Sequence, residues 1–220
     1  MNEEKYLIGI DYANRDSVIG SFIITQVIIK SNFFRNFSFL KLQEPMTQFE
    51  LNRTVELSQK HLVDFRAHVI KATELEDINT QHIKGIIELL NTQQYFWKHK
   101  IHIHWPEQGR DEFDAMLISL LPNNLKSKSE KFRLDKWIVH DGIEHLKPIM
   151  LAQAYAKYWS TNELNEIRAV WGEYGMGNAN DGITKKFLED HPDCPHIRRC
   201  KTDGTNHLRE TDSNVMDRVI

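Results

Sequence analysis

The stretch that decides the fold is residues 6–29, which reads YLIGIDYANRDSVIGSFIITQVII. It holds two apolar, β-branched runs, at 6–10 and 18–29, on either side of a polar segment at 14–16. A third apolar run, at 33–42, follows after another polar break. Short apolar runs separated by turn-forming residues are typical of neighbouring strands. We therefore predict that the chain opens with a three-strand antiparallel meander.

Beyond this opening, the apolar pattern alternates between the helical and the strand period. Thr47 and Glu50 have the spacing of a capping box, and Ser160 and Glu163 repeat that spacing later in the chain. The elements predicted here are helices at 48–61, 80–92, 111–121, 148–159 and 163–171, and strands at 63–71, 100–104 and 136–140. This order predicts an α/β fold in which the meander and the later strands form one mixed sheet with helices on both faces.

The composition excludes several classes of protein. The 220 residues carry 28 Lys and Arg against 31 Asp and Glu, a formal net charge of −3, so any nucleic-acid site must be a local patch. The most apolar stretch, 18–29, is interrupted by polar residues and falls short of the roughly 20 apolar residues of a membrane span. The acidic start of the chain lacks the apolar core of an export signal, and two cysteines exclude a disulfide framework. We therefore expect a cytoplasmic protein.

The pattern also predicts how the chain is divided. We expect one globular domain over residues 1–200 and a C-terminal tail over residues 201–220. The tail has little apolar periodicity. Such a segment is either disordered or docked on a partner, so a protein partner bound through the tail is one expectation.

Polar side chains stand where three predicted strands end. Asp11 directly follows the first strand, His104 closes the strand at 100–104, and Asp141 and Glu144 come just after the last strand. Loops at strand ends bring side chains of different strands together. Two carboxylates and a histidine that converge can hold a divalent cation, which positions water and neutralises a phosphodiester during hydrolysis. The alternative is that these are ordinary polar loop residues.

Several segments resemble type 2 ribonuclease H, the ribonuclease HII family. The opening stretch is similar to the family's G-(I/V)-D-E-A-G-R-G followed by V-(I/L)-G-P, and Asp11, Ala13, Arg15 and residues 18–20 fall in step with it without a gap. Residues 175–188, GMGNANDGITKKFL, resemble the family segment G-S-G-Y-P-S-D-P-x-T-x-x-F-L. Residues 195–202, PHIRRCKT, are similar to its ending, P-x-I-(V)-R-x-S-W-K-T. The resemblance implies the ribonuclease-H-like mixed sheet already predicted from periodicity.

The resemblance also implies which residues belong to the active site. The family uses four carboxylates that hold two Mg²⁺ or Mn²⁺ ions and cleave a strand 5′ of a ribonucleotide. Its first aspartate is Asp11 here, but its glutamate falls at Tyr12 and its next aspartate at His104. Its last aspartate falls at Glu144 or at Ile143, depending on the anchor chosen, with Asp141 as a further alternative. We expect Tyr12 to be a packing residue that fills space once used by a glutamate and an ion.

The positions that read the substrate have changed as well. The family's G-R-G motif is Asn14-Arg15-Asp16 here, which retains Arg15 as a phosphate contact but adds side chains where glycines let the ribose approach. The family's tyrosine, which packs on the next deoxyribose, falls at Asn178. Lys157, at the end of a helix that resembles the family's, is a further candidate for contact with the substrate, although most such lysines are ordinary surface residues.

Two functional hypotheses follow, with a third in reserve. The first is a protein that binds RNA/DNA hybrid or ribonucleotide-containing DNA and whose hydrolysis is altered or lost, because two carboxylates are missing and Mg²⁺ prefers oxygen to imidazole. The second is an active endonuclease in which Asp11, His104 and Glu144 hold Mn²⁺ or Mg²⁺. The third is a scaffold subunit of a protein complex.

Overall fold

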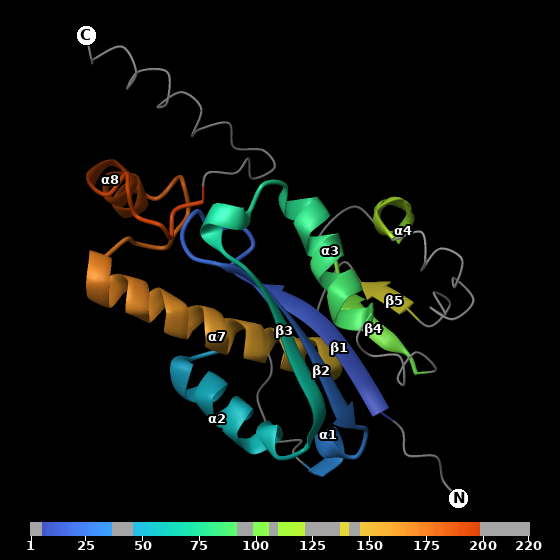
Figure 1. Ribbon diagram of the computed structural model, residues 1–220. Helices are drawn as coiled ribbons and strands as arrows, with labels where there is room; N and C mark the ends of the chain where they lie inside the picture. Colours follow the sequence, from blue (N-terminus) through green and yellow to red (C-terminus); the bar gives the residue numbers. More distant parts are fainter. Residues whose placement is uncertain are drawn as a thin grey trace, which may run out of the picture.

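The computed structural model describes residues 6–36, 46–91, 99–105, 110–121, 137–140 and 146–198. Figure 1 shows its elements in chain order. These are β1 (Tyr6–Ala13), β2 (Phe22–Lys30), α1 (Phe33–Asn36), α2 (Gln48–Gln59), β3 (Leu62–Ile70), the 3₁₀ turn η1 (Ala72–Glu74), α3 (Ile78–Asn91), β4 (Ile101–His104), α4 (Arg110–Leu120), β5 (Trp137–His140), α7 (Lys147–Trp171) and α8 (Gly182–Asp190).

The five strands form one mixed sheet in the order β3-β2-β1-β4-β5. β1 and β2 pair antiparallel, as do β2 and β3, whereas β4 runs parallel to both β1 and β5. The register places Ile10 opposite Ile103 and His104 opposite His140. Because the ends of parallel strands meet at one edge of a sheet, the residues that close β1, β4 and β5 are brought together.

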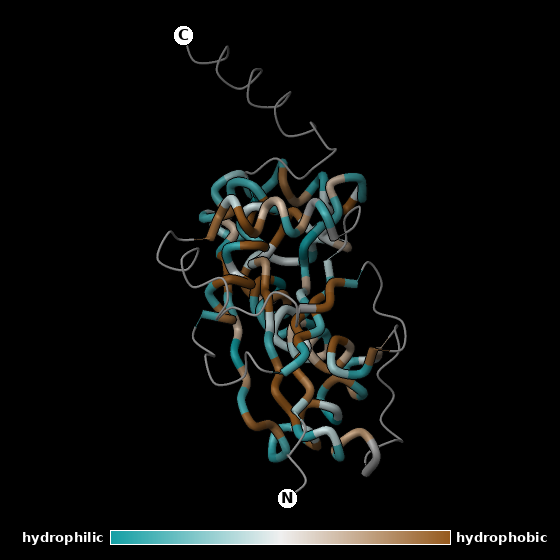
Figure 2. The backbone as a smooth tube through the Cα atoms, turned by 90° about the vertical axis from the view of Figure 1, so that its right-hand side faces the viewer, coloured by the Kyte–Doolittle hydropathy of each residue, from teal (hydrophilic) through white to brown (hydrophobic). Residues whose placement is uncertain are grey.

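Helices cover both faces of the sheet, as the sequence predicts (Figure 1). On one face, Ile8 and Ile10 of β1 pack with apolar residues of α3 and α4. On the other face, Val27 and Ile29 of β2 pack with residues of α7 and α2. Figure 2 shows brown, apolar segments running along the strands through the middle of the molecule. No helix in the described ranges is long and apolar enough to cross a membrane.

A third apolar cluster ties the loop between β1 and β2 to the C-terminal part of the fold. Val18 and Ile19 of this loop pack with residues from the end of α7, from α8 and from the segment after it. Ile19 also forms an isolated antiparallel bridge with Ile197. The last described residues therefore support a loop near the beginning of the chain.

Two predictions of secondary structure are wrong. The meander's third strand is β3, after α2, rather than residues 33–42: Phe33 and Phe34 lie in the short helix α1, and residues 37–45 lie outside the described part. Both phenylalanine side chains are buried in the apolar cluster that they share with residues of α7.

The two helices predicted at 148–159 and 163–171 form one continuous helix, α7. Ser160 is buried within it instead of capping a new helix. The capping box at Thr47 and Glu50, by contrast, is confirmed at the start of α2.

Candidate functional site

The centre of the candidate site is a contact between Asp11 and His104. The Oδ1 atom of Asp11 lies 2.8 Å from His104 Nδ1 and accepts a hydrogen bond of 2.8 Å from the backbone N–H of Tyr12. The Asp11 side chain is fully buried, and its Oδ2 atom has no hydrogen-bond partner among the described residues. The two residues meet because β1 and β4 are parallel neighbours.

Burial governs the electrostatics of this pair. Removal from water raises the pKa of the Asp11 carboxyl group, while the hydrogen bond and charge of His104, and the more distant Lys157, act in the opposite direction. Lys157 lies on α7, half-buried, so its ammonium group contributes to the field at Asp11. Ionisation of the Asp11 carboxyl group is therefore unfavourable in this buried position, and His104 and Lys157 reduce that cost.

Tyr12 fills the space beside this pair. Its ring is stacked on His104, with 5.1 Å between ring centroids and an interplanar angle of 13°. The ring also lies edge-on to Phe22 and to His82, with 5.8 and 4.8 Å between ring centroids. Tyr12 is thus a packing residue, as the sequence indicated.

The loop after β1 has a defined shape. Asn14 has a φ of +63°, in the left-handed region, and its side-chain amide donates to the carbonyl oxygens of Ile19 and Ser21, at 2.9 Å each. Asparagine is one of the few residues besides glycine that adopts this conformation at modest cost. Asn14 therefore adopts a backbone conformation that glycine favours, and it adds a side chain at this position of the loop.

Arg15 points back toward the fold. A guanidinium nitrogen of Arg15 is hydrogen-bonded to Asn79 Oδ1 at the start of α3, and the side chain is only 10% exposed. Its own backbone carbonyl accepts a hydrogen bond of 2.8 Å from Arg198, which also donates to Gly20 O at 2.7 Å. The charge of Arg15 thus lies at the base of the loop, while Asp16 is exposed beside it.

The segment around Asn178 adjoins this loop. The carbonyl oxygen of Gly177 accepts hydrogen bonds from Val18 N at 2.8 Å and from Ser17 Oγ at 3.1 Å. Asn178 itself is exposed, and its side-chain oxygen accepts from Asn180 N. The structure therefore places Asn14, Arg15 and Asn178 on two adjoining loops. His104 ends β4 as predicted, whereas Asp11 lies inside β1, which continues to Ala13 instead of ending before it.

Comparison with known proteins shows what the chain is similar to. No family model matches the chain. A protein of Methanococcus aeolicus named ribonuclease HII is 25% identical over 245 residues, covering 100% of this chain and 88% of its own length. Another of that name, from Picrophilus torridus, is 27% identical over 182 residues, covering 82% of this chain and 84% of its own length. The solved ribonuclease HII in the PCNA complex of Archaeoglobus fulgidus superposes with a TM-score of 0.70 at 15% identity, over 92% of this chain and 98% of that one.

The chain is a divergent relative of ribonuclease HII. The resemblance read from its sequence motifs is confirmed, and the fold is the mixed α/β fold of the solved relatives. The differences concern the positions that carry the chemistry.

The described residues do not fit the two-ion site of ribonuclease HII. Within the described ranges, no group of three His, Cys, Asp or Glu side chains could hold a metal ion. One oxygen of Asp11 is already engaged by His104, and Tyr12 offers an aromatic ring instead of a carboxylate. Hard cations such as Mg²⁺ require several oxygen ligands. The candidates for the last ligand, at positions 141, 143 and 144, lie outside the described residues.

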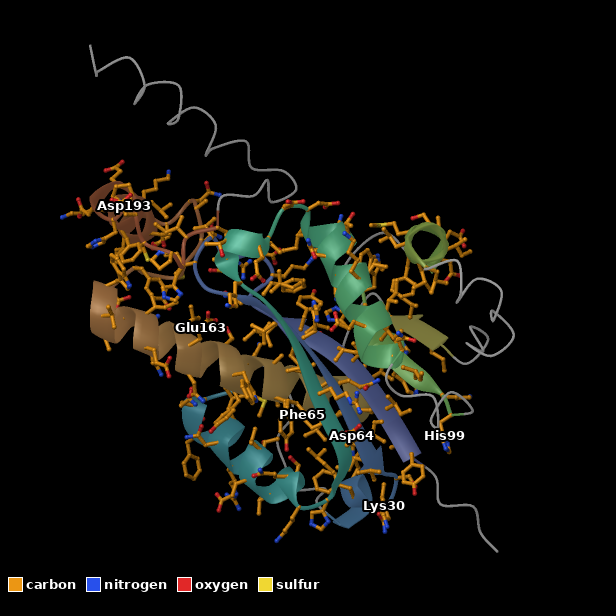
Figure 3. All side chains as sticks on the ribbon, viewed as in Figure 1. Lys30, Asp64, Phe65, His99, Glu163 and Asp193 are labelled. Atoms are coloured by element: carbon orange, nitrogen blue, oxygen red, sulfur yellow. The ribbon has the colours of Figure 1, made fainter. Side chains whose placement is uncertain are left out.

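Three residues that support the site were not found from the sequence. Arg198 is fully buried and holds the loop after β1 through hydrogen bonds from its guanidinium group to Arg15 O and Gly20 O. Glu163 of α7, labelled in Figure 3, accepts hydrogen bonds from the backbone N–H and the hydroxyl of Ser21. His82 of α3 packs under Tyr12. The family ending PHIRRCKT contained the signal for Arg198, but its contacts depend on the tertiary fold.

His82 gives a prediction for pH dependence. It is fully buried among Tyr12, Phe22 and Trp105, and neither ring nitrogen has a hydrogen-bond partner within the described structure. Burial, with the charges of Arg15 and His104, lowers its pKa well below the usual value.

Below about pH 6.5 the unfolded chain binds a proton that the folded protein excludes, so stability falls as pH falls. Between pH 7.5 and 5.5 this one histidine should cost about 1.4 kcal/mol. We expect His82→Leu to remove that part of the slope in urea unfolding across this range. Parallel pH profiles for the two proteins would contradict the assignment.

Proposed function

We propose that this ribonuclease HII relative binds RNA/DNA hybrid or ribonucleotide-containing DNA and that its phosphodiester hydrolysis is lost or strongly altered. The observation that carries the proposal is the state of Asp11, whose carboxylate is buried and turned to His104 beside the stacked ring of Tyr12. The side chains of His104 and Tyr12 thus pack around Asp11, the one carboxylate of the site among the described residues.

The chemistry of the replacements argues against Mg²⁺. Tyrosine and histidine in place of two carboxylates remove about two negative charges from the site. Imidazole is also a softer ligand than a carboxylate, so the loss is smaller for Mn²⁺ than for Mg²⁺. One solved neighbour, a ribonuclease HIII that superposes with a TM-score of 0.64 at 10% identity, was determined in complex with Mn²⁺.

The two adjoining loops, after β1 and around Asn178, support the proposal that nucleic-acid binding is retained. Asn14 keeps a left-handed turn, and Gly177 joins the loop after β1 to the segment of Asn178. Arg15, held under the loop by Asn79, and Lys157, whose charge acts on Asp11, supply positive charge that favours an approaching phosphate. A protein partner bound through residues 201–220, and a cytoplasmic location, stay predictions from the sequence.

One observation favours the second candidate, an active endonuclease that uses Asp11, His104 and Glu144. The Oδ2 atom of Asp11 is buried and lacks a hydrogen-bond partner in the part of the chain that the structure describes. A buried carboxylate oxygen without a partner is unfavourable, and a single cation would satisfy it.

The test combines binding and cleavage on the same labelled substrates: RNA/DNA hybrid, DNA duplex with one embedded ribonucleotide, and single strands. Fluorescence anisotropy in EDTA should show binding to the hybrid that weakens steadily with added salt. The same mixtures with Mg²⁺ should show no cleavage, and Asp11→Asn should leave binding in place.

Two outcomes would overturn parts of the proposal. Cleavage with Mg²⁺ or Mn²⁺ that disappears in Asp11→Asn would establish a working metal site. Failure to bind any of the substrates at low salt would leave the scaffold hypothesis instead.

A further inference from the structure

Met176 is an apolar side chain that a tightly built loop holds in solvent. It is 80% exposed, the largest exposed fraction among the exposed large apolar residues of the described chain. The residues on both sides, Gly175 and Gly177, have φ values of +73° and +72°, in the left-handed region. The loop thus uses two glycine conformations to present one side chain.

The backbone of this loop is tied down at each residue. The N–H groups of Gly175, Met176 and Gly177 donate to Glu173 Oε1, Asp181 Oδ2 and Thr184 Oγ1, at 3.0, 3.3 and 3.1 Å. A side chain at position 175 would collide with Asp181, and one at position 177 would lie 2.5 Å from Ser17 Oγ. The loop is therefore ordered by its own contacts, although Met176 itself points away from the core.

The surroundings of Met176 connect it with the candidate interface. Gly177 accepts hydrogen bonds from Val18 and Ser17, so the loop adjoins the one that follows β1. On its other side, Ile183 of α8, 54% exposed, lies against Gly175. Two exposed apolar side chains, Met176 and Ile183, thus belong to this loop and to the helix beside it, at the border of the proposed nucleic-acid site.

We propose that Met176 is the apolar contact to the bound nucleic acid, packing against a base or sugar beside the loop after β1. This inference rests on the proposed function and names the side chain that reads the strand. Methionine is flexible and polarisable, and apolar side chains on ordered loops pack on or wedge between bases. Asn178 is unsuited to that contact because its amide closes a turn with Asn180.

The experiment uses the full chain and an RNA/DNA hybrid that carries 2-aminopurine at successive positions. Met176→Ser should weaken binding about tenfold, the order expected when a buried methionine contact is lost. It should also reduce the change in 2-aminopurine fluorescence at one position of the strand. The salt dependence should stay the same, because no phosphate contact is removed.

Two further variants control for effects on folding and on general hydrophobicity. Met176→Leu keeps an apolar side chain and should retain binding within about twofold. Val170→Ser removes a side chain that is 77% exposed on α7 and should bind as the natural chain does.

Two results would contradict the role of Met176 or the proposed function. If Met176→Ser binds the hybrid as tightly as the natural chain, with unchanged fluorescence, this inference is wrong and the proposed function stands. If the natural chain binds neither the hybrid nor ribonucleotide-containing DNA, the proposed function is wrong and this inference falls with it.

Discussion

The double variant Tyr12→Glu, His104→Asp is expected to gain a rise in melting temperature with Mg²⁺ that the natural chain lacks. The two changes place carboxylates next to Asp11, where β1 and β4 end side by side. Without a cation, three neighbouring carboxylates repel one another and the variant should be less stable than the natural chain. A cation that binds only the folded state reverses this loss by mass action.

The size of the effect follows from linkage. For a dissociation constant on the order of 1 mM, 10 mM Mg²⁺ stabilises the folded state by about 1.4 kcal/mol. In a chain of this length that corresponds to a rise of about 3 °C, measurable by thermal unfolding. Tyr12→Gln, His104→Asn is the matched control, because it has nearly the same shape without the charges. An equal rise in the natural chain would contradict the loss of the site.

Gly9→Ala is expected to destabilise the fold by about 3 kcal/mol, at the upper end for overpacked positions. Gly9 lies in β1 directly against the start of α7, where an added Cβ would collide with the carbonyl group of Pro148. The obstacle is backbone, so relief requires a shift of the helix rather than a change of rotamer. That shift would also move Lys157, whose charge acts on Asp11.

Urea unfolding measures this prediction, and α8 offers a control. Gly182 has no atom within 4 Å of an added Cβ and no positive φ, so Gly182→Ala should be neutral or slightly stabilising at this helix start. If Gly9→Ala lowers the free energy of unfolding by less than about 1 kcal/mol, α7 can shift away from the sheet at little energetic cost, and the prediction is wrong.

The sequence predicted those elements whose apolar pattern is regular. The alternation in β3, the capping box of α2 and the helical face of α3 are local signals, and all three elements were found within a few residues of their predicted bounds. The errors arose where tertiary contacts decide. Phe33 and Phe34 have the apolar character of a strand, but they lie in a short helix and pack with residues of α7 and α2. Glu163 bonds to Ser21 across the fold rather than capping a helix of its own.

For the candidate site, the sequence indicated which residues lie near one another but not how their side chains contact each other. That His104 ends a strand could be predicted from the sequence, whereas β1 continues two residues past Asp11; parallel pairing of β1 and β4 explains why the two residues meet. That the carboxylate is engaged by the imidazole, under a stacked Tyr12, depends on side-chain positions that no spacing encodes. α8 was missed because it is a short, largely polar helix, although Asp181 caps it through Thr184 N.

The bridge between Ile19 and Ile197, together with the hydrogen bonds from Arg198 to Arg15 and Gly20, has a consequence for synthesis on the ribosome. The loop after β1 is synthesised about 180 residues before the segment that supports it. At typical translation rates of about 5–20 residues per second, that loop waits roughly ten seconds or more for its partners. A ribosome stalled before residue 198 would therefore carry a chain whose sheet could pair while the loop after β1 still lacked these supports.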